Sequence, residues 1–115
     1  MKLIIAVIQP TKLAAVREAL EKIEVMRLTI CDAQGFGVQL GHATQWHAGR
    51  PDTRMLRKIA LEIVVNDDFL ERTIETIENV ARTGTEGNIG DGKILVLPAE
   101  DAIQIDDSRR GQGSV

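Results

Sequence analysis

The amino-acid sequence predicts an α+β fold in which four strands and two helices follow in the order β-α-β-β-α-β. Three observations favour this fold. Four short segments are apolar and rich in β-branched residues, two longer segments carry apolar residues at helical spacing, and glycine-rich, proline-containing or polar stretches separate them. A chain of 115 residues suits a single domain, so we expect one domain over residues 1–115.

The first strand and the first helix occupy the beginning of the chain. Leu3–Ile8 is an apolar, β-branched run that Pro10 ends, as expected for a central strand. We expect Thr11 to cap a helix over Lys12 to about Ile23, because one face of this segment is apolar: Leu13, Val16, Leu20 and Ile23.

A long polar stretch separates the second and third predicted strands. Met26 to about Phe36 reads as the second strand, and the third runs from Met55 or Lys58 to Val65 with alternating apolar residues. Between them, little apolar sequence occurs, which predicts a long exposed loop at about 40–54. Long loops inside compact domains are usually functional or disordered, so we expect this flexible loop to carry function.

The second helix, a glycine-rich loop and the fourth strand complete the fold. Asn66, Asp67 and Asp68 suit a helix start, and one face of the following segment is apolar: Leu70, Ile74, Ile77 and Ala81. The loop Gly84–Gly92 then leads to the fourth strand, Lys93–Leu97. We expect the polar tail, residues 106–115, to be mobile.

This order of elements is that of the ferredoxin-like folds, in which an antiparallel sheet carries both helices on one face. Here a long loop joins strands 2 and 3. The second face of the sheet is left open, because no third long helix remains to cover it. A second subunit is the simplest cover, so we expect an oligomer.

Composition excludes several classes of function. The net charge is −3 and basic residues are mixed with acidic ones, which argues against nucleic-acid binding through a basic patch. The few aromatic residues, Phe36, Trp46 and Phe69, argue against base stacking. The single cysteine, Cys31, cannot form an internal disulfide, which fits a reducing compartment, and we expect it to be a small core residue.

The first residues also bear on location. Their apolar run is too short for a signal peptide, and no small-residue cleavage site follows it. No segment is long enough to cross a membrane. We therefore expect a cytoplasmic protein without direct membrane insertion.

Two glycine clusters come close to phosphate-binding motifs. Gly35–Gly41 lacks the third glycine of a dinucleotide fingerprint, because Leu40 stands there and a loop follows. Gly87–Ile94 matches G-x-x-x-x-G-K, but Ile94 replaces the hydroxyl residue that holds magnesium, and a P-loop leads from a strand into a helix. This second cluster is either a tight turn that needs glycines or an anion cradle of backbone N–H groups with Lys93.

Several stretches together resemble a known family. They are the opening strand through Pro10, Val16-Arg17-Glu18-Ala19-Leu20, Gly35-Phe36-Gly37 with Gln39 and Gly41-His42, Glu62-Ile63-Val64-Val65, Thr83-Gly84, and Ile89-Gly90-Asp91-Gly92-Lys93-Ile94. On these motifs, residues 1 to about 105 resemble the PII signal-transduction proteins, often called nitrogen regulatory protein P-II.

The resemblance implies a homotrimeric regulator that binds ATP or ADP in clefts between subunits, with Mg possible beside ATP. The nucleotide-binding residues would be Val7, Thr29, Gly35, Phe36, Gly37, Val38, Gln39, Glu62, Val64, Gly90, Asp91, Gly92 and Lys93. Gln39 and Lys58 would hold 2-oxoglutarate or another effector. The loop at 40–54 would dock on a partner enzyme, transporter or transcription regulator.

The chain departs from the family pattern at several positions. Val38 stands where the family has a basic residue, and Gln104 and Asp106 stand where it has two arginines that reach a neighbour's nucleotide. Arg109 and Arg110 lie just beyond and are candidates to replace them. These departures leave the ranking of ATP, ADP and AMP open. Control by tyrosyl modification is excluded, because the chain has no Tyr.

Two other functions remain open on the sequence. One is a PII-like sensor of bicarbonate or a metal linked to transport, for which His42 and His47, with Asp52, are weak metal-site candidates. The other is a ligand-free oligomeric adaptor, which the missing phosphate-binding residues favour. Trp46, in the polar loop, either anchors an interface or folds back onto its own subunit. We expect no enzyme, because the sequence contains no Cys–His pairing and no GxSxG or HExxH motif.

Overall fold

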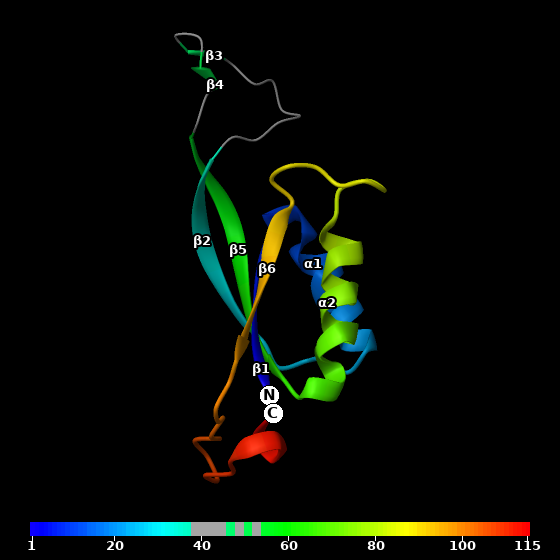
Figure 1. The fold of residues 1–115 in the computed structure, drawn as a ribbon, viewed down its shortest axis with the longest axis vertical. Coiled ribbons are helices and arrows are strands. Elements are labelled where there is room, and N and C mark those ends of the chain that lie inside the picture. Colours follow the sequence, from blue (N-terminus) through cyan, green and yellow to red (C-terminus); the bar gives the residue numbers. More distant parts are fainter. Residues whose placement is uncertain (38–45, 48–49, 52–53) are drawn as a thin grey trace.

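Figure 1 shows the fold of the computed structural model, which describes residues 1–37, 46–47, 50–51 and 54–115. The main elements follow in the predicted order: β1 (Lys2–Ile8), α1 (Leu13–Lys22), β2 (Thr29–Gly37), β5 (Arg54–Val65), α2 (Asp67–Ala81) and β6 (Gly92–Pro98). Short elements accompany them: the 3-10 helices η1 (Pro10–Lys12) and η2 (Gly111–Ser114), and the paired strands β3 (Trp46–His47) and β4 (Arg50–Pro51).

The main sheet confirms the predicted ferredoxin-like α+β fold. Its strands lie in the order β2-β5-β1-β6, and every neighbouring pair is antiparallel. Helices α1 and α2 lie side by side on one face of this sheet (Figure 1). In the part of the chain that the structure describes, no helix is long and apolar enough to span a membrane.

The entry into the first helix differs from the prediction. Thr11 does not cap it, because Pro10 begins the 3-10 turn η1 and the N-cap position falls on Lys12, which makes no side-chain capping bond. Asn66 does occupy the N-cap of α2, as predicted, although its side chain accepts no capping bond from the first turn. The predicted loop at 40–54 lies mostly outside the described residues.

The hydrophobic core lies between the sheet and the two helices. Alternate residues of β1 and β5 point into it, and one apolar stripe of each helix meets them: Ile4, Ala6, Ile8, Ile59, Leu61, Ile63, Val65, Val16, Leu20, Ile77 and Ala81. Period-2 burial in the strands and helical spacing in α1 and α2 therefore explain how the sequence selects this layer arrangement.

The face of the sheet opposite the helices carries the other half of each strand. Ile5 lies opposite Glu62 on β5 and Leu95 on β6, and directly opposed residues of antiparallel strands share a face. On the edge strand β6, Leu95 and Leu97 remain 44% and 41% exposed. This open face is therefore apolar but for a few charged groups, and in a single chain it faces water.

The chain end folds into a hydrogen-bonded turn beside the N terminus (Figure 1). The Asp101 carboxylate accepts bonds from the backbone N–H groups of Ala102 and Gly111 at 2.9 and 3.0 Å. The buried Ser114 hydroxyl lies 2.7 Å from the carbonyl oxygen of Ala102, and Gln104 Nε2 donates to the Ser114 carbonyl oxygen at 2.6 Å. This ordered turn differs from the mobile tail that the sequence predicted. The polar residues of the tail show no periodicity that would reveal the hydrogen-bond network.

Candidate functional site

The glycine-rich loop between α2 and β6 adopts a backbone that only glycine takes without strain. Gly90 and Gly92 have φ of 102° and 124°, in the region that L-residues avoid. A Cβ on Gly92 would lie 1.8 Å from the carbonyl oxygen of Val7. Glycine at position 92 therefore lets the loop meet the end of β1 at a distance that no side chain permits.

Asp91 ties this loop together from inside. Its carboxylate accepts hydrogen bonds from the Thr83 backbone N–H at 2.9 Å, the Thr83 hydroxyl at 2.5 Å and the Asn88 backbone N–H at 2.8 Å. Partial desolvation acts to raise the pKa of the Asp91 carboxyl, but the bonds from Thr83 and Asn88 outweigh it, so the pKa lies below its ordinary value. Asp91, near the end of the loop, thus ties that end to Thr83 at the start of the loop and to Asn88 within it.

Substituting Asp91→Asn tests this role. The amide keeps one acceptor oxygen but places an NH₂ group against N–H donors, so we expect faster hydrogen exchange at the Thr83 and Asn88 amides. In the wild type, the folded-state pKa of Asp91 is lowered. Its carboxylate should therefore protect the Thr83 and Asn88 amides fully above the ordinary pKa of an Asp carboxyl, and this protection should be lost as pH falls through the lowered pKa. Glu86→Gln, in the same loop, is the control, and equal exchange in both variants would contradict this role.

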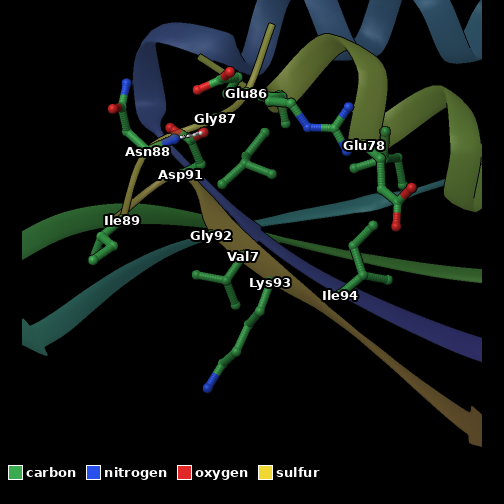
Figure 2. Close-up of a pocket in the computed structure, with 14 residues that line it drawn as sticks. Val7, Glu78, Glu86, Gly87, Asn88, Ile89, Asp91, Gly92, Lys93 and Ile94 are labelled. Atoms are coloured by element: carbon green, nitrogen blue, oxygen red, sulfur yellow. Dashed lines mark hydrogen bonds between the residues drawn. The ribbon is translucent and has the colours of Figure 1, made fainter. Parts of the chain in front are cut away.

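A hollow of about 550 Å³ lies beside this loop, and we call it the loop hollow (Figure 2). Apolar residues line much of it: Val7, Ile8, Ile77, Ala81 and Ile94. Charged residues of α2 and the loop also line it: Glu78, Arg82 and Glu86. Figure 2 shows the Lys93 side chain pointing away from Asp91, toward the opposite side of β6. Val7, Asp91, Gly92 and Lys93 of the predicted set all line this hollow.

Lys58 connects the middle of β5 to the same loop. Its ammonium group donates to the carbonyl oxygen of Gly90 at 2.5 Å, and the residue is only 8% exposed. The Lys58 stem passes over Gly35, where an added Cβ would lie 3.5 Å from Cγ. The predicted effector lysine and the glycine loop, 32 residues apart in sequence, are thus in direct contact.

A second hollow of about 400 Å³, the tail hollow, lies between the start of β2 and the chain end. Three predicted residues, Thr29, Glu62 and Val64, line it together with Gln104 and Ser114. No described residue lines both hollows, and β5 and β1 lie between the strands β2 and β6 that bear Thr29 and Lys93. The predicted nucleotide-binding residues therefore form two groups on one subunit.

Cys31 lies near the tail hollow rather than in the core where we expected it. Cys31 pairs with Ala60, whose side of the sheet faces away from the helices, and it is partly exposed. Its thiol donates a weak hydrogen bond to Glu62 Oε1 at 3.5 Å, and this bond, followed by desolvation, raises the pKa of the Cys31 thiol. Successive side chains of a strand point to opposite faces of the sheet, so a shift of one residue moves a side chain from the core face to the open face. This explains why the expectation of a core Cys31 was wrong.

The remaining predicted residues divide between described and undescribed parts. Val38, Gln39 and His42 lie outside the described residues, as does Asp52, and for Phe36, Gly37, Trp46 and His47 only the backbone is described. Among the described residues, no group of three or more His, Cys, Asp or Glu is placed to hold a metal. The metal candidates therefore remain predictions.

The two arginines of the tail have partners within the turn itself. Arg109 Nε lies 2.7 Å from Asp107, and Arg110 lies 3.3 Å from Asp101. Neither arginine lines the loop hollow or the tail hollow. The expectation that one of them replaces a missing phosphate contact gains no support from this geometry.

Comparison with known proteins identifies the family of the chain. The sequence profile described as "Nitrogen regulatory protein P-II" matches residues 1–109. The chain belongs to this family. Nitrogen regulatory protein GlnK1 of Methanosarcina mazei is 45% identical over 115 residues, covering 100% of this chain and 97% of the relative. Nitrogen regulatory protein P-II of Bradyrhizobium diazoefficiens is 41% identical over the full length of both chains.

A solved structure agrees with the P-II assignment. The crystal structure of Arabidopsis thaliana PII bound to citrate superposes with a TM-score of 0.77 at 34% identity, covering 98% of this chain and 87% of that one. The P-II proteins are regulators that act on partner proteins, which confirms the expectation that this chain is not an enzyme.

Proposed function

We propose that this P-II chain binds adenine nucleotides in clefts between the subunits of a homotrimer and controls a partner enzyme, transporter or regulator through its loop at 40–54. The observation that carries the proposal is the division of the predicted residues between two hollows, one toward the β2 edge of the sheet and one toward the β6 edge. Each hollow is half a site, and a neighbouring copy would bring the other half.

The loop hollow has the chemistry of the phosphate half. Glycines at positive φ can turn their backbone N–H groups toward an anion, and Lys93 supplies a positive charge from the open face of the sheet, which a neighbouring subunit would cover. The tail hollow has the chemistry of the base half, since Val64 supplies an apolar surface while Thr29 and Glu62 supply hydrogen-bonding groups. ATP or ADP is the ligand that these groups suit, with AMP possible and Mg accompanying ATP.

The open face of the sheet supports the trimer. Ile5, Leu95 and Leu97 present apolar surface that a neighbouring subunit would cover, and β6 offers an unpaired strand edge. A cytoplasmic location is part of the proposal, because the single cysteine fits a reducing compartment.

The effector in this proposal is 2-oxoglutarate, bound at Lys58 with Gln39. Lys58 is a buried ammonium whose described partner is the neutral carbonyl of Gly90, so a carboxylate would satisfy its charge better. The Arabidopsis thaliana PII structure contains citrate, another polycarboxylate. Carboxylate binding at this lysine would also disturb the phosphate loop, which links the effector to the nucleotide.

Calorimetric titration with ATP, ADP and AMP, with and without Mg and 2-oxoglutarate, tests the proposal, with light scattering to establish the oligomer. We expect a trimer that binds nucleotide. Lys58→Met should weaken nucleotide binding about tenfold even without effector, because the loop loses a charged hydrogen bond. The variant should also abolish the effect of 2-oxoglutarate.

Arg57→Met is the matched control for this titration. Arg57 is the neighbouring cation on β5, but it is exposed and lies 3.9 Å from Asp32 on the other face of the sheet. It should bind nucleotide as the wild type does. A monomer in solution, or a wild-type chain that binds no nucleotide, would overturn the proposed function.

A further inference from the structure

Among the described residues that line the tail hollow, one is cationic: Arg27. Arg27 lies in the short segment between α1 and β2, and buried neighbours hold that segment in place. Val25 is 7% exposed, its N–H donates to the Leu20 carbonyl oxygen at 2.9 Å, and Leu28 packs against the core. The backbone at Arg27 is therefore anchored on both sides while its side chain remains exposed.

The charge of Arg27 is not neutralised by the described part of the chain. No described carboxylate forms an ion pair with it, whereas Arg109 and Arg110 pair with Asp107 and Asp101. Glu62 lines the same hollow, but within the described structure its carboxylate accepts a bond from Cys31 rather than from Arg27. The guanidinium is thus available to a ligand in the tail hollow.

The other described residues that line the tail hollow bring no positive charge. Gln104 is one of them, and its neutral amide donates from Nε2 to the Ser114 carbonyl oxygen at 2.6 Å. Glu62 adds a carboxylate to the same hollow. On the subunit that holds the base, a phosphorylated ligand that extends from this hollow therefore meets its attractive charge at Arg27.

We propose that Arg27 binds the phosphates of a nucleotide whose base lies in the tail hollow, and that it makes the site prefer longer phosphate chains. The inference rests on the proposed function, since it places the phosphates on a neighbouring copy's glycine loop. A guanidinium binds phosphate oxygens through paired, charge-assisted hydrogen bonds. Each added phosphate gives it further acceptors, so the order of affinity should be ATP, then ADP, then AMP.

Titration of Arg27→Ala with adenosine, AMP, ADP and ATP tests this role. ATP binding should weaken about tenfold or more, in line with the loss of a charge-assisted bond, while adenosine binding stays unchanged. Arg17→Ala is the control: Arg17 is exposed on α1 and lines neither the tail hollow nor the loop hollow. It should bind all four ligands as the wild type does.

Two further readings separate a phosphate contact from a structural role. Arg27→Lys should recover part of the ATP affinity, because it keeps the charge and loses the paired geometry. The ATP affinity of the wild type should also fall more steeply with salt than that of Arg27→Ala. Equal losses for adenosine and ATP, or no loss at all in a wild type that binds ATP, would overturn the inference. Absence of nucleotide binding in the wild type would instead overturn the proposed function beneath it.

Discussion

Gly92→Ala should destabilise the protein more than any other glycine substitution in the loop. The added Cβ would lie 1.8 Å from the Val7 carbonyl oxygen and 2.9 Å from its carbon, and both are backbone atoms of β1 where its pairing with β6 ends. The φ of 124° adds conformational strain. Together these effects should cost about 3 kcal/mol or more.

Thermal unfolding measures this cost, and Gly84→Ala is its matched control. Gly84 also has positive φ, at 67°, but an added Cβ there meets no atom within 4 Å. We expect a loss of about 1 kcal/mol for Gly84→Ala, and a midpoint lower by about 10 °C or more for Gly92→Ala. Nucleotide binding should be lost in Gly92→Ala at temperatures where the variant is still folded. Equal stability of the two variants would show that the close approach at position 92 carries no cost.

Local patterns in the sequence predicted the fold well, because they follow from the geometry of single elements. The apolar run Leu3–Ile8 predicted β1, and the stripe through Ile77 and Ala81 predicted the buried face of α2. The glycine motif was consistent with a tight turn or an anion cradle. The positive φ of Gly90 and Gly92 confirms the tight turn, and it leaves the cradle as a proposal.

The contacts that build the candidate site could not be predicted in this way. The bond between Lys58 and Gly90 depends on the register of β5 against β1 and of β1 against β6, which no local pattern encodes. Asp91 was expected to face phosphates, yet its carboxylate turns into the loop toward Thr83. Arg27 belongs to no motif in the sequence, and only the folded chain places it in one hollow with Thr29 and Glu62.

Variants of either half of the proposed site should lose nucleotide binding without losing the oligomer. Lys93→Ala removes the positive charge of the phosphate half, and Thr29→Ala combined with Glu62→Ala removes the polar groups of the base half. Each should weaken binding about tenfold to a hundredfold, since charged or buried hydrogen bonds are lost. All three side chains are exposed on the described subunit, and the apolar residues proposed to hold the trimer, Ile5, Leu95 and Leu97, are unchanged. Light scattering should therefore find the same mass as for the wild type.

Mixing the two variants is the measurement that tests the shared site most directly. Chains of the two kinds are unfolded together, refolded, and titrated with ATP at a concentration that neither variant alone can bind. If each site joins the loop hollow of one subunit to the tail hollow of its neighbour, random assembly restores both intact halves at about a quarter of the interfaces. We predict that this fraction binds ATP with wild-type affinity. Mixed oligomers that bind no more ATP than either parent would contradict the account.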